Sequence, residues 1–162
     1  MEALDIKEDS SKTAISEANS LQLIAFTIGD QIYGVEITTV REIRAWNGAT
    51  PLPNTREFVR GVINLRGTIV PIFDLRSRFG DGQTSPTKTH VVVVMSVGDK
   101  WVGVLVDAVS DILTVSKDEI HAVPEGSSSS ETGLLSGIIT HDNRMVGLID
   151  LHEVVAGAKL DS

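Results

Sequence analysis

Two blocks of sequence occur twice in this chain, in the same order, and this repeat limits the folds available to it. The stretch GDQIYGVEITTVREI (29–43) aligns without a gap with GDKWVGVLVDAVSDI (98–112). The stretch GVINLRGTIVPIFDL (61–75) aligns in the same way with GIITHDNRMVGLIDL (137–151). Glycines and apolar positions match within both pairs, which predicts an internal duplication. The alternative explanation is convergence, in which the stretches are similar only because both form strands joined by turns.

Each copy contains short strands separated by tight turns. Gly-Asp pairs at 29–30 and 98–99, Arg-Gly at 66–67 and Asp-Asn at 142–143 interrupt the apolar runs, a pattern typical of β-hairpins. Apolar residues make up 41% of the 162-residue chain, and the many Val and Ile among them suit strands. The sequence therefore predicts an all-β fold, with a short C-terminal helix in DLHEVVAGAKL (150–160).

The duplication predicts two similar β subdomains, in halves of approximately 21–85 and 86–158. Units of ~60 residues bury little apolar surface alone, so we expect the two subdomains to pack against each other. Contact between two such units would also create a cleft, the first place to look for a ligand. Residues 1–20 are polar and acidic, and they predict a disordered tail.

Composition and motifs exclude several classes of function. A net charge of −8 disfavours nucleic-acid binding, and the lack of cysteine excludes disulfides and thiolate metal sites. No apolar run approaches the ~20 residues that span a bilayer, and the N-terminus does not resemble a signal peptide. We therefore expect a cytoplasmic protein without membrane insertion. The four histidines lack metal-ligand spacing and no phosphate-binding loop is present, so we expect no enzyme activity, cofactor or metal.

The second repeated block has an aspartate near its end in both copies, at equivalent positions. Asp74 and Asp150 could be imagined as a catalytic acid pair, but both stand where a strand ends. Capping of a following helical turn is the expected role. His141 and Asp142 lie on a predicted hairpin turn, where an exposed polar pair is the expected interpretation.

The repeated blocks also resemble the CheW family, the coupling proteins of bacterial chemotaxis. The resemblance extends in order from about residue 21 to residue 155. It includes FTIGDQIYGVEITTVREIRAW, GVINLRGTIVPIFDLRSRFG, HVVVVMSVGDKWVGVLVDAVSDIL and IHAVPE, and the NLRG block followed by DLR is its most specific part. It implies two intertwined, five-stranded SH3-like β-barrel subdomains, in agreement with the duplication.

The same resemblance implies an adaptor that joins two kinds of signalling protein in arrays at the membrane. Its partners would be the methyl-accepting chemotaxis receptors, the regulatory domain of the histidine kinase CheA, and other copies of the chain. By family position, the receptor-binding residues are Val40, Glu42, Arg66, Val91, Val109 and Ile112. The four apolar residues among them would form a groove for receptor helices, with plain barrel core as the alternative.

Arg66 stands at a turn where the second copy has Asp142. The fold alone explains why glycines and apolar residues match between the copies, but it does not require this difference. We therefore expect function at Arg66, with a solvated turn arginine as the alternative. Glu42 is a weaker case, because Asp111 keeps an acid at the equivalent place. An exposed ion pair between Glu42 and Arg66 would stabilise the fold by only ~0–1 kcal/mol.

The resemblance further implies contacts with the kinase. Pro51 and Leu52 lie where the first barrel of the family meets the kinase domain. A second kinase contact uses a basic and an aromatic residue in enteric-type members, and His121 and Gly126 occupy those places here. The departure indicates either that this contact is lost or that the partner has changed with it.

Two rival functions stay open at this point. A small-molecule sensor would bind its ligand in the cleft between the barrels, but the aromatic content of 4% speaks against an apolar pocket. A nucleic-acid binder would need basic strands with interleaved aromatic residues, and the acidic charge makes that class remote.

Overall fold

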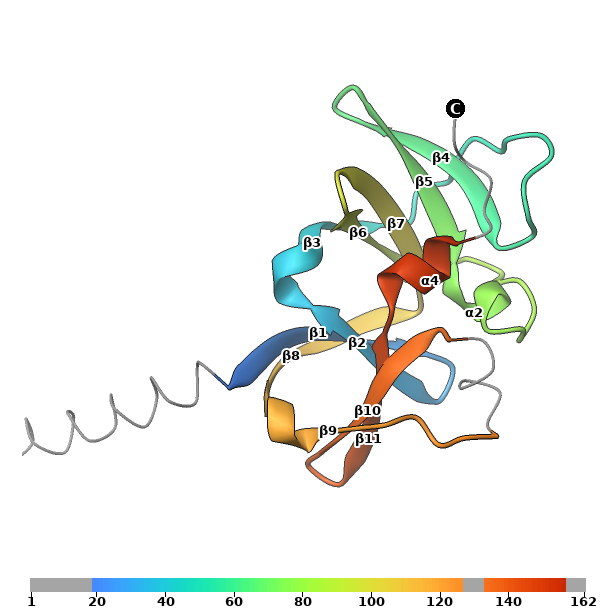
Figure 1. Ribbon diagram of the computed structural model, residues 1–162. Coiled ribbons are helices and arrows are strands. Elements are labelled where there is room, and N and C mark those ends of the chain that lie inside the picture. The colour runs from blue at the N-terminus through green and yellow to red at the C-terminus, as the bar shows by residue number, and fades with distance from the viewer. Residues whose placement is uncertain (1–18, 127–132, 157–162) are drawn as a thin grey trace, which may run out of the picture.

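The described part of the chain, residues 19–126 and 133–156 of a computed structural model, is built mainly from strands (Figure 1). The strands are β1 (Ser20–Ile28), β2 (Gln31–Glu36), β3 (Val40–Ala45), β4 (Val59–Leu65), β5 (Thr68–Asp74), β6 (Val91–Val97), β7 (Lys100–Val106), β8 (Ala108–Ser116), β9 (Ile120–His121), β10 (Leu135–His141) and β11 (Arg144–Ile149). The helical elements are the 3₁₀ turns η1 (Ile37–Thr39) and η2 (Lys117–Glu119) and the α-helices α2 (Leu75–Arg78) and α4 (Leu151–Val155).

The hairpin turns and the two ends of the described chain can be compared with the expectations from the sequence. The four predicted turns each join two strands of a hairpin. The expected C-terminal helix is present as α4, Leu151–Val155, and residues 157–160 of that stretch lie outside the described residues. β1 already begins at Ser20, and residues 1–18 of the expected tail lie outside the described residues. Within the described ranges, no helix is long and apolar enough to cross a bilayer.

The strands form two sheets that have the same internal order. One sheet runs β8-β1-β2-β11-β10-β9 and the other β3-β6-β7-β5-β4. We call them the six-stranded barrel and the five-stranded barrel. The hairpin β1–β2 in the first sheet corresponds to β6–β7 in the second, β8 to β3, and β10–β11 to β4–β5. Each barrel therefore takes one hairpin from one half of the sequence and its other main strands from the other half.

Strand register repeats between the barrels as well. The parallel pairing of β5 with β7 places Ile72 opposite Gly103, and the pairing of β11 with β2 places Leu148 opposite Gly34. These are matched positions of the two sequence repeats. The expected duplication is therefore confirmed in both strand order and register.

Each sheet curls until its two edges meet. In the five-stranded barrel, Thr50 follows β3 and exchanges two backbone hydrogen bonds of 2.8 Å with Val62 in β4. In the six-stranded barrel, β9 pairs with β10 and closes the sheet in the same way. The first closure requires Gly61, because its φ is 138° and a Cβ there would overlap the Thr50 carbonyl oxygen.

The buried apolar side chains form three clusters. One lies inside each barrel, around Val70 and Ile72 in the five-stranded barrel and around Leu23 and Ile139 in the six-stranded barrel. The largest joins side chains of both sheets and of α4, which Figure 1 shows at the boundary between the barrels. The expected packing of one subdomain on the other is therefore present, and buried side chains fill this interface.

The two short helices cover this boundary and are capped alike. Asp74 is fully buried and accepts hydrogen bonds from Ser77 N at 3.3 Å and from Thr84 N and Oγ1 at 2.7 Å. The Asp150 carboxylate accepts from two backbone N–H groups in the first turn of α4. The expected capping role is confirmed for both aspartates. Arg78 then links the helices by donating to backbone carbonyls of α4, and burial lowers the pKa of Arg78 although Glu153 raises it.

The matched glycines Gly34 and Gly103 give a test of barrel packing. A Cβ at Gly103 would lie 2.6 Å from Ile72 Cδ1 and 2.9 Å from Val92 Cγ1, whereas one at Gly34 meets nothing closer than 3.4 Å. Gly103→Ala is therefore expected to lower the free energy of unfolding by about 1–3 kcal/mol, and Gly34→Ala to change it by less than about 1 kcal/mol. Urea denaturation measures both. Equal losses would contradict the packing described here.

Candidate functional site

A cluster of three charged side chains lies where the two edge strands of the five-stranded barrel, β3 and β4, come together. We call this place the seam of the barrel. Glu42 Oε1 is 2.6 Å from Arg66 Nη2, and Glu42 Oε2 is 3.5 Å from Arg44 Nη1. Glu42 comes from β3 and Arg66 from the β4–β5 turn, which lie at opposite edges of the sheet. The ion pair that the sequence analysis considered is therefore present, and it spans the two edges that the curled sheet brings together.

The backbone at Arg66 is unusual for an arginine. Arg66 has a φ of 51° and Gly67 a φ of 91°, the left-handed conformation that two-residue hairpin turns need. The equivalent turn has Asp142 at 52° and Asn143 at 63°. Asp and Asn tolerate this conformation well, but a long side chain such as arginine does so only at a cost. The turn itself therefore does not explain Arg66, whose side chain is ion-paired with Glu42.

The apolar candidates lie on the sheet faces that turn toward the core between the barrels. Val40, Val91 and Val109 are partly buried against that core. Ile112 is paired with Ile24, whose side chain belongs to the same core, yet 54% of Ile112 is exposed. The three half-buried valines therefore belong at least partly to the core. Ile112 is largely accessible and is available to a groove.

Ile43 belongs to this set, although it is not among the residues predicted from the sequence. It pairs with Val93 of the same core and is 44% exposed. The repeat contained the signal, since Ile43 aligns with Ile112. We call the five residues that border the inter-barrel core in this way the apolar margin; they are Val40, Ile43, Val91, Val109 and Ile112.

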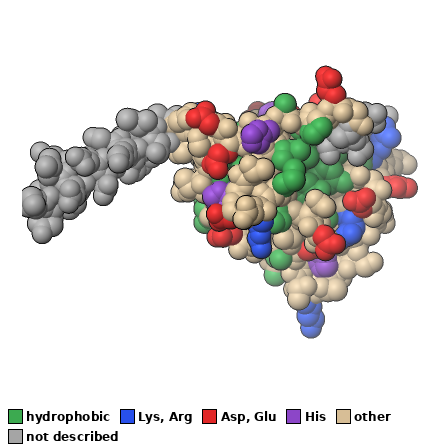
Figure 2. Space-filling model, turned by 90° about the horizontal axis from the view of Figure 1, so that it is seen from below, with side chains coloured by type: hydrophobic (Ala, Val, Ile, Leu, Met, Phe, Trp, Pro, Cys, Tyr) green, Lys and Arg blue, Asp and Glu red, His purple; other side chains and the backbone are tan. Residues whose placement is uncertain are grey.

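Exposed hydrophobic side chains gather visibly on one face of the molecule. Figure 2 views it from the side of the six-stranded barrel and shows a green band with acidic and basic side chains around it. An apolar centre with a charged rim is the usual anatomy of a surface that binds another protein.

The four candidate kinase contacts lie on the closing segments of the two barrels. Pro51 and Leu52 directly follow Thr50, which closes the five-stranded barrel, and both are exposed. His121 is in β9, paired with Ile138, and is exposed, as is Gly126 beyond it. Because Val62 and Ile138 are matched positions of the repeat, His121 corresponds to Thr50, and the two pairs of candidates lie on equivalent closing segments of the two barrels.

These surfaces offer charged groups and apolar area. Within residues 19–126 and 133–156, no group of three or more His, Cys, Asp or Glu side chains could hold a metal ion. The charged cluster is partly exposed, with 71% of the Arg66 side chain and 25% of the Glu42 side chain accessible. It can therefore present a cation and an acid to a partner beside an apolar surface.

Comparison with known proteins agrees with this arrangement. The family model described as the CheW-like domain matches residues 22–159. The chain is similar to the probable chemotaxis protein CheW of Rhizobium etli, with 51% identity over 80% of this chain and 84% of that protein. It is also similar to the chemotaxis protein CheW of Rhizobium meliloti, with 47% identity over 82% of this chain and 86% of that protein.

A solved structure shares both the fold and part of the sequence. The crystal structure of the scaffolding protein TtCheW from Thermoanaerobacter tengcongensis superposes with a TM-score of 0.77 at 29% identity, covering 86% of this chain and 90% of that one. The family model covers most of the sequence, and one relative is 51% identical to it. The chain therefore belongs to the CheW family of chemotaxis scaffold proteins.

Proposed function

We propose that this protein is a non-catalytic adaptor that couples methyl-accepting chemotaxis receptors to the histidine kinase CheA. It would work in the cytoplasm and be recruited to receptor arrays at the membrane. Family membership supports the scaffold role. The observation that carries the coupling role is Arg66, which is held in a left-handed turn against Glu42 beside the apolar margin.

The receptor surface combines this charged pair with the apolar margin. Receptor tips are helical hairpins, and a helix docks by laying apolar side chains against an apolar surface rimmed by polar groups. Ile43 and Ile112 offer exposed apolar area for such a contact, and the three valines support them from the inter-barrel core. Arg66 and Glu42 would then select the polar side chains of the receptor helix.

The kinase would bind at the barrel-closing segments. Pro51 and Leu52 provide one contact, and His121 with Gly126 provides the equivalent place on the other barrel. Two contacts at equivalent places would let one adaptor join two kinase domains, or a kinase and a second copy of this chain. A single contact of micromolar strength is worth about −8 kcal/mol, so arrays would depend on several contacts acting together.

The first experiment is co-sedimentation of the purified protein with receptor-containing membranes, with and without CheA from the same organism. The proposal expects the protein to pellet with receptors and to recruit the kinase. Binding to neither partner would contradict the adaptor role. A small-molecule function would then become the leading explanation.

Arg66→Asn separates binding from folding. Asn tolerates the left-handed turn, so the free energy of unfolding should stay within about 1 kcal/mol of the parent, because the lost exposed ion pair is also worth little. Receptor affinity should fall about tenfold, or about 1.4 kcal/mol. Chemical denaturation and quantitative co-sedimentation measure the two effects.

The equivalent turn supplies the control for this variant. Asp142→Asn makes a comparable change and should leave both folding and receptor binding unchanged. If Arg66→Asn binds receptors as well as the parent does, Arg66 is only a solvated turn residue. If it unfolds several kcal/mol more easily, its role is structural.

Ile112→Ala and Val109→Ala compare the exposed and half-buried parts of the apolar margin. Ile112 is 54% exposed, so its truncation should cost less than about 1 kcal/mol of stability while weakening receptor binding several-fold. Val109 packs on the inter-barrel core, so its truncation should cost about 1–2 kcal/mol of stability. Unchanged receptor binding by the Ile112 variant would remove this residue from the proposed surface.

A further inference from the structure

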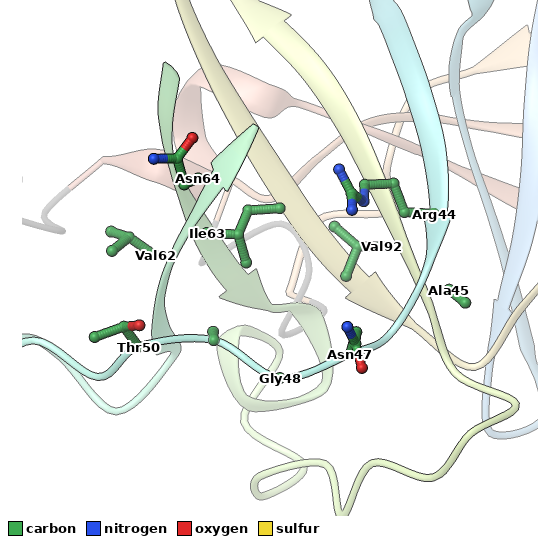
Figure 3. Close-up of a pocket in the computed structure, with 10 residues that line it drawn as sticks. Arg44, Ala45, Asn47, Gly48, Thr50, Val62, Ile63, Asn64 and Val92 are labelled. Carbon is green, nitrogen blue, oxygen red and sulfur yellow. The ribbon is translucent and has the colours of Figure 1, made fainter. Parts of the chain in front are cut away.

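A pocket lies in the seam of the five-stranded barrel, on the opposite face of β3 from Ile43. Its volume is about 450 Å³, within the range of small-molecule sites. Residues of β3 and β4 form its two sides, and the segment between Asn47 and Thr50 crosses one end. Figure 3 shows Arg44 extending from β3 over Val92 toward Ile63.

The six-stranded barrel shows why this pocket exists. Arg44 pairs with Val92 of β6, and the equivalent position Leu113 pairs with Leu23 of β1. Leu113 packs against the core inside its barrel, which includes Leu23. Arg44 instead extends to Glu42 and leaves 39% of its side chain exposed. An arginine has therefore taken a position where the fold accepts leucine, and space remains beside it.

The six-stranded barrel keeps a smaller hollow beside Leu113, of about 180 Å³, and its seam is paired over a longer stretch. β8 runs on to Ser116, and β9 then pairs with β10. β3 ends at Ala45, and a single bridge, Thr50 to Val62, closes the five-stranded barrel. The difference lies in the seam itself, because the strand order and register of the two barrels are otherwise the same.

The lining of the pocket favours an anion. Arg44 is its only charged residue, and none of the residues that line it is acidic. Asn47 contributes a side-chain amide. The Asn64 carbonyl oxygen accepts from Gly67 N at 2.8 Å, and its amide nitrogen points away from Arg44 in Figure 3. Val92 and Ile63 provide an apolar floor. In a chain with a net charge of −8, such a lining is a specific departure from the surface as a whole.

Arg44 has donor capacity to spare for a ligand. Its recorded ion pair is a single 3.5 Å contact to Glu42, whose other oxygen is held by Arg66 at 2.6 Å. A guanidinium has five N–H donors in a fork that matches a carboxylate. Two arginines share one carboxylate in this cluster, so an incoming acid would balance its charge.

We propose that this seam pocket binds a carboxylate carried on a short aliphatic chain, with Arg44 as the anchoring cation. The carboxylate pairs with the guanidinium and the Asn47 amide, and the aliphatic part lies on Val92 and Ile63. The same chemistry is available from a free dicarboxylate and from a glutamate side chain of another protein. This site goes beyond the proposed adaptor function; it lies on the face of β3 that also carries Glu42, opposite Ile43.

The test is a titration of the full chain followed by ¹H–¹⁵N NMR. Glutarate and a capped peptide with two glutamates are the probes, and the matched glutamine peptide and sodium chloride of equal ionic strength are the controls. The expected result is a set of shifts confined to residues 44–50 and 62–64, with a Kd of about 1 mM or below. Arg44→Leu should fold, since Leu113 occupies the equivalent place, and should lose these shifts. Arg44→Lys keeps the charge without the fork and should bind at least several-fold more weakly.

Shifts with both acidic probes show that a free carboxylate is sufficient, and shifts with the peptide alone assign the pocket to a protein side chain. Either result supports the site. It is overturned if neither probe shifts these residues, if the glutamine peptide acts equally, or if the shifts persist in Arg44→Leu. Should Arg44→Leu fail to fold, Arg44→Lys decides by the same comparison, and unchanged affinity in it overturns the role of the guanidinium.

Discussion

The exchange of hairpins between the two barrels is the constraint on which the rest of the structure depends. Each barrel places a hairpin from one half of the sequence between strands from the other half. Neither half contains the strands to close a barrel alone, and the largest core cluster lies between the barrels. The residues of the apolar margin lie where this inter-barrel core reaches the surface. The charged cluster forms because the curled sheet brings β3 close to the β4–β5 turn. A change in strand pairing would therefore remove both surfaces together.

Because the two barrels arose by duplication, each can be compared with the other residue by residue. Their strand order, bulges and parallel register agree, so the shared fold does not by itself require the differences between matched residues. Arg66 replaces an aspartate in a turn of the same conformation, and Arg44 replaces a leucine beside the barrel interior. Both changes place positive charge around Glu42 in the five-stranded barrel. The backbone is thus shared between the halves, whereas this charge chemistry belongs to one of them.

Much of the local structure could be predicted from the sequence, because it depends on neighbouring residues. Turn dipeptides located all four hairpins, and the aspartates at the strand ends located both helix caps. Pairing between distant strands leaves no such local signal, so the intertwined arrangement came from the family resemblance and not from periodicity. Side-chain roles were harder still. Ile43 and Arg44 are adjacent in β3 but lie on opposite faces, and only the register shows that one borders the inter-barrel core and the other the seam.

The hairpin exchange also affects how the chain can fold while the ribosome synthesises it. When β3, β4 and β5 have emerged, the strands that separate them in the sheet, β6 and β7, have not yet been synthesised. The early chain therefore carries unpaired strand edges and uncovered valines, the features that promote aggregation. In the complete fold, pairings such as that of β1 with β8 join residues far apart in the sequence, which slows folding. A growing chain of this kind cannot complete its first barrel until β6 and β7, the first hairpin of its second half, are available.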